Sequence, residues 1–221
     1  MTLLEANPRT GERDQLVTPL PWPTNLPELA AGLRVRLLID MDTISRGMAS
    51  NPASGRASDW QVQRCLDIVQ ATARALDPYA QARYAASSKT AAHHLTVLTS
   101  SGNGIWSIRR GLGGADQVIL EELNSLTEDR VLATRPHRPR PAHHANMIIL
   151  VAADHAYAAA VRRLRLLGVP TWGIVPGRFV AASLHSSCCA LSYLRADPAG
   201  PHTLNGRVAR QPSHSSCRRP R

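Results

Sequence analysis

Apolar positions along this chain fall into short runs and into segments with helical spacing. Residues 33–39 and 147–151 are largely aliphatic runs, which is typical of strands that are buried on both faces of a parallel sheet. Between residues 58 and 76, apolar side chains recur every three or four positions, as on one face of a helix. The whole pattern predicts strands over 33–39, 79–86, 105–109, 147–151 and 171–175, and helices over 58–76, 91–99, 115–126, 155–167 and 179–194.

Strands and helices alternate through the middle of the chain. This alternation is typical of proteins in which right-handed crossovers place helices on both faces of a parallel sheet. We therefore predict an α/β fold with three layers, α/β/α, and a mostly parallel central sheet over residues 33–194. Residues 58–61, Ser-Asp-Trp-Gln, form the capping-box pattern that begins a helix. The polar segment 43–57 and the basic segment 130–146 are predicted to be loops.

The two ends of the chain differ in composition from the predicted domain. Residues 1–32 contain five prolines and are predicted to be a disordered arm, and residues 195–221 carry six arginines and are predicted to be a basic disordered tail. No apolar stretch approaches the roughly 18–20 residues of a membrane helix. The first residues also lack the apolar core of a signal peptide. We therefore expect a cytoplasmic protein.

Acidic residues gather where two predicted strands end. Asp40 and Asp42 follow the run 33–39 directly, and Asp154 lies three residues past the run 147–151. Right-handed crossovers place these two loops on the same edge of the sheet, where α/β proteins bind their ligands. An unpaired buried carboxylate is costly. Asp40 is therefore expected to serve a cation or a reacting centre.

Two further acids lie on the predicted helix 115–126. Asp116 begins this helix, and Glu122 falls within its apolar stripe, where a carboxylate needs a cation partner or a polar cavity. Several carboxylates at one sheet edge suit Mg²⁺ or Mn²⁺, which prefer oxygen ligands and can activate water for attack on a phosphodiester. Alternatively, Asp116 and Asp154 could stabilise helix N-termini. Asp42 could belong to a turn, and Glu122 could extend into solvent.

The charge balance favours a polyanionic partner. The chain has a net charge of +10, and Lys89 is the only lysine among its 26 basic residues. This balance is typical of proteins that bind nucleic acid, although basic tails on an ordinary soluble domain would give the same value. The candidate phosphate contacts are Arg46, Arg109, Arg110, Arg135, Arg138 and Arg140.

Other familiar chemistries find little support in the sequence. The glycine-rich segments near residues 102–116 lack the third glycine of a dinucleotide fingerprint. The adjacent pairs His93-His94 and His143-His144 lack ligand spacing and are interpreted as solvated. The four cysteines show no paired spacing and are interpreted as buried free thiols. Trp60, Trp106 and Trp172 are either base-stacking residues or core residues.

Three segments combine these acids in a definite order. They read LIDMDTI at 38–44, GADQVILEEL at 114–123 and IILVAADHAY at 148–157. In order and spacing they resemble the NYN domain family, a branch of the PIN-like nucleases, over about residues 33–194. The resemblance implies a PIN-like, Rossmann-like fold and metal-dependent cleavage of RNA. It also implies that Asp40, Asp42, Asp116 and Asp154 bind the metal, that Asp40, Asp116 and Asp154 are catalytic, and that Glu122 supports them.

The chain departs from the family pattern at several positions. Thr43 replaces an asparagine, Gly113 replaces a lysine and Ala152-Ala153 replaces Ser-Gly. Ala156 stands where the family has a second aspartate in its last motif, so one ligand of the metal is missing. The neighbouring His155 is either a substitute ligand or an exposed residue in the first turn of a helix.

These features lead to one main hypothesis and two alternatives. The main hypothesis is an endoribonuclease that uses Mg²⁺ or Mn²⁺ and acts on RNA, preferentially single-stranded. The first alternative is a catalytically weakened NYN-like module for RNA binding or regulatory interaction, which Ala156 favours. The second alternative is a Rossmann-like sensor of a small nucleotide.

Overall fold

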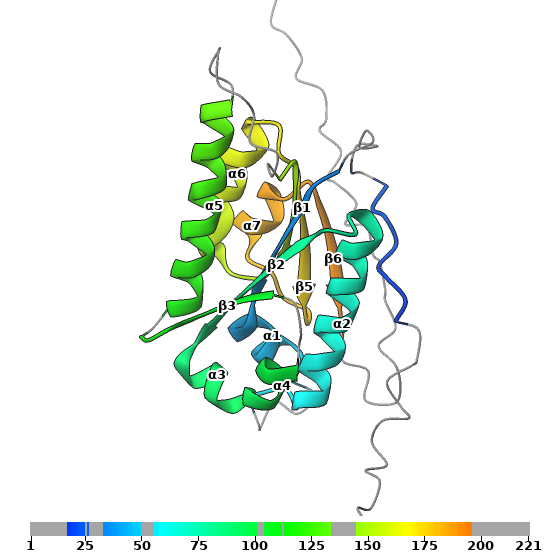
Figure 1. Cartoon of the computed structure of the whole chain (residues 1–221), viewed down its shortest axis with the longest axis vertical. Coiled ribbons are helices and arrows are strands. Elements are labelled where there is room, and N and C mark those ends of the chain that lie inside the picture. Colours follow the sequence, from blue (N-terminus) through cyan, green and yellow to red (C-terminus); the bar gives the residue numbers. More distant parts are fainter. Residues whose placement is uncertain are drawn as a thin grey trace, which may run out of the picture.

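A six-stranded sheet forms the centre of the molecule (Figure 1). The computed structural model describes residues 17–24, 26, 33–49, 55–100, 104–111, 113–133 and 145–195. All neighbouring strands are parallel, in the order β3-β2-β1-β4-β5-β6. The strands are β1 Val35–Asp40, β2 Gln81–Ser87, β3 Gly104–Arg109, β4 Met147–Val151, β5 Thr171–Pro176 and β6 Ala190–Leu194.

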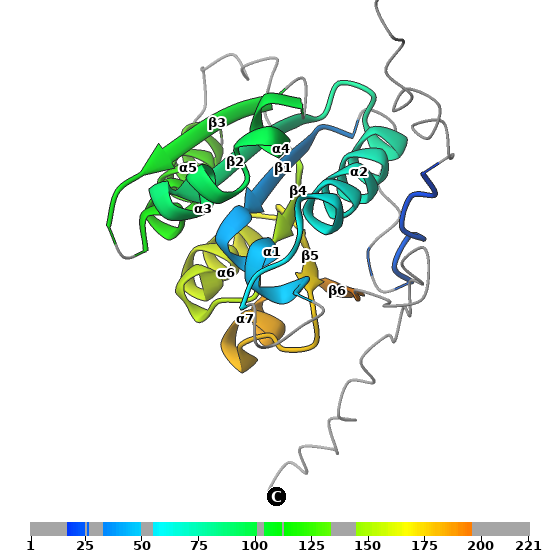
Figure 2. The ribbon, with the colours of Figure 1, turned by 90° about the horizontal axis from the view of Figure 1, so that it is seen from below.

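Helices cover both faces of this sheet, so the predicted three-layer α/β/α fold is confirmed (Figures 1 and 2). One face is covered by α1 Met41–Gly47, α2 Asp59–Leu76, α3 Ser88–His93 and α4 Leu95–Ser100. The other face is covered by α5 Gly114–Ala133, α6 Ala158–Leu166 and α7 Ala182–Ser187. A short 3₁₀ helix, η2 His155–Tyr157, directly precedes α6. None of the described helices is long and apolar enough to cross a membrane.

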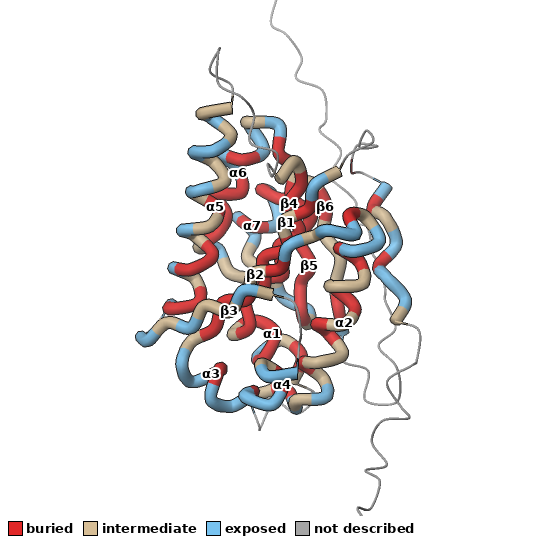
Figure 3. The backbone as a smooth tube through the Cα atoms, in the orientation of Figure 1, coloured by how far each residue is buried: buried red, intermediate tan, exposed pale blue. Residues whose placement is uncertain are grey.

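The two apolar cores follow from the alternation of side chains along the strands. Leu37 and Ile39 of β1 belong to the core under α1 and α2, whereas Leu38 belongs to the core under α5 and α6. Every residue of β4 and β5 is buried, as expected for strands covered on both faces. Figure 3 shows this buried centre inside a shell of exposed helix surfaces.

Several predicted segments differ from the structure. The helix α5 extends into the predicted loop 130–146, and the predicted helix 91–99 is divided into α3 and α4. The predicted loop 43–57 begins with a helix, α1, because Asp40 caps its N-terminus by accepting a hydrogen bond from the Thr43 amide. The predicted helix 179–194 is a short helix, α7, followed by the strand β6. Beyond Ser187, the backbone pairs with β5 instead of continuing the helix, and the Cys189 amide donates to Thr171 O.

The segment predicted as a disordered N-terminal arm contributes to the fold. Leu20 and Leu26 are buried in the core on the α2 side. The Leu20 amide donates a hydrogen bond to Thr72 Oγ1 on α2 at 2.9 Å. Trp22 packs edge-on against Trp172 of β5, with ring centroids 6.0 Å apart. The domain therefore includes residues before 33.

Several local predictions are confirmed. Ser58 and Gln61 form the capping box at the start of α2. Cys65 and Cys188 are free and buried. Burial raises the pKa of each of these two thiols to about 12, which makes them unreactive.

Candidate functional site

The strand order reverses between β1 and β4, and this is where the candidate site lies. β1 ends at Asp40, and Asp154 lies three residues beyond β4. In parallel sheets, the crevice at such a reversal, outside the carboxyl ends of the strands, is the usual place for a ligand. Figure 2 looks onto this edge, with α1 in its centre. The predicted convergence of the two loops at one sheet edge is thus explained by the topology.

Asp40 is completely buried at this edge and is held by neutral donors. Its Oδ1 accepts a hydrogen bond from the Thr43 amide at 3.1 Å, and its Oδ2 accepts one from Thr43 Oγ1 at 2.6 Å. Burial raises the pKa of Asp40 to about 6, against the Thr43 hydrogen bonds, which lower it. The charges of Asp116 and Asp42 raise this pKa further. Asp40 is therefore a carboxyl group whose charge is poorly compensated at neutral pH.

Tyr157 joins Asp40 to Asp116. Its hydroxyl lies 3.0 Å from Asp40 Oδ2 and 2.5 Å from Asp116 Oδ1. Burial, followed by the charge of Asp40, raises the pKa of Tyr157, so the hydroxyl stays protonated. A hydroxyl donates only one hydrogen. The Tyr157 hydroxyl donates its hydrogen bond across the shorter contact, to Asp116 Oδ1. When Asp40 is protonated, its own O–H can donate to the Tyr157 oxygen across the longer contact.

Tyr157 is a site residue that sequence reasoning missed. Tyr157 lies in the segment 155–167, which the sequence predicts to be a helix, and its side chain is buried. The position of its hydroxyl between two carboxylates depends on the tertiary packing of η2 against α5. One signal was available in the sequence, because a buried tyrosine hydroxyl usually finds a polar partner.

Asp42 and Asp154 are engaged separately from this pair. Asp42 Oδ1 accepts hydrogen bonds from the amide and the hydroxyl of Ser87, at 3.1 and 3.0 Å. Asp154 caps η2 by accepting from the Ala156 amide at 3.1 Å, and it contacts Nδ1 of the exposed His155 at 2.7 Å. Asp154 therefore stabilises a helix N-terminus, which was the alternative role that the sequence analysis gave for it.

The structure tests how well these acids suit a divalent cation. Within the described part of the chain, no three His, Cys, Asp or Glu side chains converge as a metal-binding group. The predicted four-carboxylate arrangement is thus not assembled, and Asp40 and Asp116 form the pair that remains. Carboxylate oxygens are suitable ligands for Mg²⁺, which is often bound by one or two carboxylates with waters and phosphate oxygens. The pair fits such an ion if the cation takes the place of the Tyr157 hydroxyl.

Glu122 lies away from the pair and has cation partners of its own. Its Oε1 is 3.5 Å from Arg36 Nε and its Oε2 is 3.2 Å from Arg83 Nε. It lies six positions beyond Asp116 on α5, which is about 9 Å along the helix. The sequence analysis predicted that Glu122 needs a cation partner or a polar cavity, and the structure shows two cation partners, Arg36 and Arg83. Glu122 therefore stabilises the packing of α5 on β1 and β2.

The predicted phosphate contacts divide into three groups. Arg46 and Arg110 are exposed at the carboxyl edge of the sheet, and Arg46 Nε donates to Asp42 O at 3.1 Å. Arg109 is engaged by Glu121 through two contacts of 2.6 and 2.8 Å. Two exposed cations that we did not predict, Lys89 on α3 and Arg178 after β5, also follow strand ends. Arg135, Arg138 and Arg140 lie outside the described residues.

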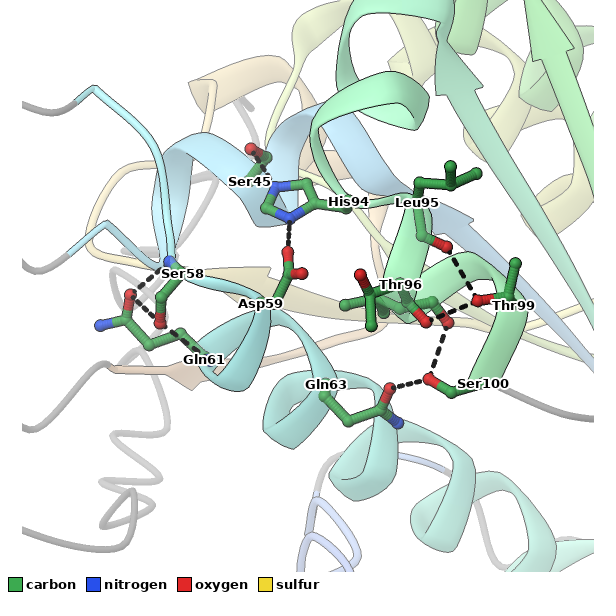
Figure 4. A network of polar contacts seen from close by, with 11 residues as sticks. Ser45, Ser58, Asp59, Gln61, Gln63, His94, Leu95, Thr96, Thr99 and Ser100 are labelled. Carbon is green, nitrogen blue, oxygen red and sulfur yellow. Dashed lines mark hydrogen bonds and ion pairs between the residues drawn. The ribbon is translucent and has the colours of Figure 1, made fainter. Parts of the chain in front are cut away.

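A second polar network lies beside α1 (Figure 4). His94 is completely buried, contrary to the solvated interpretation, whereas His93 is exposed. His94 Nε2 lies 2.9 Å from Ser45 Oγ and its Nδ1 lies 2.7 Å from Asp59 Oδ1. The contacts follow the order of a nucleophilic Ser-His-Asp triad. However, Ser45 is only 2% exposed within α1, so a substrate has no access to its hydroxyl.

The Ser45–His94–Asp59 network is therefore interpreted as a structural tie. It joins α1, the residue between α3 and α4, and the first turn of α2. Because α1 begins directly after Asp40, the tie also fixes the helix that carries Asp42 and Thr43. The hydrogen bonds of this network therefore hold the residues of the candidate site that lie on α1 in position.

No family model, curated protein or solved structure matches this chain. The resemblance to the NYN family therefore stays a prediction that rests on the three sequence segments. The fold is shown by the structure itself, and the site has to be argued from its own geometry.

Proposed function

We propose that this protein is a metal-dependent endoribonuclease that cleaves RNA at the carboxyl edge of its sheet. The observation that carries the proposal is the Asp40–Tyr157–Asp116 arrangement. Two carboxylates from distant segments meet at the reversal of the strand order, and neutral groups hold them there. If these two acids had only a structural role, a cationic side chain would be expected beside them.

The roles of the residues follow from their positions. Asp40 and Asp116 would hold Mg²⁺ or Mn²⁺, which when bound activates water and stabilises charge on a phosphodiester. Thr43 fixes the orientation of Asp40 through its amide and hydroxyl. The Tyr157 hydroxyl stays protonated and donates a hydrogen bond to Asp116 Oδ1, at the place between the two carboxylates that the cation would take. Asp42, held by Ser87, adds negative charge beside the pair.

The distribution of charge supports a nucleic-acid substrate. A recessed acidic centre repels a polyanion, so cations on its rim are needed to hold the phosphates. Arg46, Lys89, Arg110 and Arg178 are exposed and follow the carboxyl ends of strands. Asp40 is fully buried and Asp116 is partly exposed, so RNA would reach the pair from the Asp116 side, which a single strand can approach more closely than a rigid duplex.

A second function is favoured by one specific observation. The Tyr157 hydroxyl lies between the two carboxylates, and Ala156 offers no further ligand. An RNA-binding or regulatory module without cleavage would be consistent with both features. Such a module would bind RNA, as the main proposal expects, but would not hydrolyse it.

The test is cleavage of a labelled single-stranded RNA by the full chain with Mg²⁺ or Mn²⁺. The controls are EDTA and the double variant Asp40→Asn/Asp116→Asn, which removes negative charge and should retain or strengthen RNA binding. Cleavage that requires both the metal and the carboxylates supports the nuclease. Wild-type protein that binds RNA but never cleaves it supports the binding module instead.

A further inference from the structure

The loop between β5 and α7 exposes an aromatic ring. Phe179 is 86% exposed, more than any other large hydrophobic side chain in the described chain. Trp172, by contrast, is completely buried, and Trp106 stacks on Tyr84 at 4.2 Å between ring centroids. Because exposed aromatic surface is unfavourable in water, a flat ligand that covers Phe179 would gain free energy.

Backbone contacts hold this loop beside the candidate site. At its end, the Ala181 amide donates to Ala153 O at 2.9 Å, directly before Asp154. At its start, Gly177 has a φ of +91° and lies so close to α1 that an added Cβ would be 2.7 Å from Gly47 O. Phe179 is two residues from each of these anchors, within about 8 Å of chain. Phe179 is therefore placed on the rim of the edge where Asp40 lies.

Cations flank the ring on the same rim. Arg178 is exposed next to Phe179 in the chain, and Arg46 is exposed next to Gly47, against which the loop packs. An exposed ring with exposed arginines next to it in the chain and on the neighbouring helix offers a flat apolar surface and donors for phosphate oxygens. This combination matches a nucleobase with its neighbouring phosphates. A protein surface or a membrane would instead require a contiguous apolar patch.

We infer that Phe179 stacks on a base of single-stranded RNA while Arg178 binds a neighbouring phosphate. The inference rests on the proposed function, since it places the RNA at the same sheet edge. Stacking on one ring accepts any base, so the contact positions the strand without strong sequence preference. Its consequence is a phosphodiester held beside the Asp40–Asp116 pair.

The inference is tested by RNA binding to the full chain in EDTA, where metal-dependent cleavage cannot occur. Phe179→Ala should weaken the affinity for a labelled single-stranded oligonucleotide by about 5- to 100-fold. The matched control is Tyr79→Ala, because Tyr79 is 79% exposed before β2, at the opposite edge of the sheet. This control should bind as the wild type does. Phe179→Trp should retain affinity, and RNA should quench the fluorescence of the added indole.

An abasic oligonucleotide separates stacking from charge. It keeps the phosphates and lacks the bases, so Phe179→Ala should bind it as well as the wild type does. Equal affinity of the wild type and Phe179→Ala for the normal oligonucleotide would overturn the inference, as would an equal loss on both oligonucleotides. If the wild type still cleaves RNA with Mn²⁺ in that case, the proposed function survives. If the wild type neither binds nor cleaves RNA, the proposed function and the inference both fail.

Discussion

Two acids on the same helix, α5, have opposite surroundings. Glu122 lies between Arg36 and Arg83, and all three side chains are largely buried. Asp116, about 1.7 turns earlier, contacts the Tyr157 hydroxyl and lies near the buried Asp40. None of the ion pairs among the described residues includes Asp116 or Asp40.

The difference separates a structural acid, Glu122, from an acid that we propose to be functional, Asp116. The charge of Glu122 is already compensated, so it contributes to packing and has little left for a ligand. The charges of Asp40 and Asp116 are held by hydroxyl and amide groups, which orient a carboxylate without neutralising it. A cation bound there would relieve their repulsion. The following substitutions test this comparison.

The largest contrast is expected in catalysis. Asp116→Asn should reduce metal-dependent RNA cleavage by at least about 100-fold, because even partners outside the metal's direct ligands contribute 10- to 100-fold. Glu122→Gln, on the same helix, should retain cleavage at a temperature where it is folded. The initial rates with Mn²⁺ measure both. Equal losses in the two variants would remove the distinction between the acids.

Asp40→Asn should stabilise the protein at alkaline pH. The pKa of Asp40 is about 6 in the folded protein and 3.8 in a model peptide. Between these two pH values Asp40 is therefore protonated in the folded state and ionised in the unfolded state. Stability from Asp40 is therefore present below about pH 4 and is lost as the pH rises through about 6. At pH 8 the variant should gain up to about 3 kcal/mol, and near pH 4 the gain should vanish. Urea unfolding in EDTA at both pH values measures this, and a pH-independent difference would contradict it.

Glu122→Gln should destabilise the fold. The substitution keeps the shape but removes the carboxylate charge that lies between Arg36 and Arg83. Breaking a buried ion pair costs about 3–5 kcal/mol, and partial exposure of these side chains reduces this to about 2 kcal/mol. Urea unfolding measures the loss. The triple variant with Arg36→Met and Arg83→Met should recover part of it, and an undestabilised single variant would argue against a structural role.

Ser45→Ala tests the network around His94. The substitution removes the hydroxyl partner of a buried ring nitrogen and should cost about 1–2 kcal/mol of stability. RNA cleavage should persist, and fluorophosphonate reagents should label neither the wild type nor the variant, because Ser45 is buried. Labelling of the wild type that disappears in Ser45→Ala would instead identify a serine nucleophile.

Tyr157→Phe should have the smallest effect. In the wild type the hydroxyl competes with a cation for the oxygens of Asp40 and Asp116. Its removal should tighten Mn²⁺ binding by about 3- to 10-fold, equivalent to one net hydrogen bond. Calorimetric titration with Mn²⁺ measures this. Weaker binding in the variant would show that the hydroxyl positions the carboxylates for the cation.

The sequence predicted the parts of the fold that depend on local patterns. The aliphatic runs at β1 and β4 and the capping box of α2 led to the correct layers, because burial and capping leave periodic signals. The strand β6 was missed because its pairing with β5 is a tertiary contact. Residues 17–24 and 26 were missed for the same reason, since Leu20 and Leu26 become core residues only when the domain is assembled.

The sheet edge that carries the candidate site could be predicted from the sequence. The ends of β1 and β4 could be placed at one edge from strand order rules alone. The Tyr157 hydroxyl and the partners of Glu122 could not, because they depend on how α5 packs on the sheet. His94 was also misinterpreted, since two adjacent histidines give no signal of which one is buried. Contacts between distant segments therefore distinguish Glu122, which has cationic partners, from Asp40 and Asp116, which we propose to bind a cation.

Mn²⁺ binding by the wild type, Asp116→Asn and Glu122→Gln tests the central distinction most directly. We expect calorimetry of the full chain to show a Mn²⁺ site in the wild type that Asp116→Asn abolishes and Glu122→Gln retains. Absence of binding in the wild type, or binding that survives Asp116→Asn, would contradict a cation site at the Asp40–Asp116 pair.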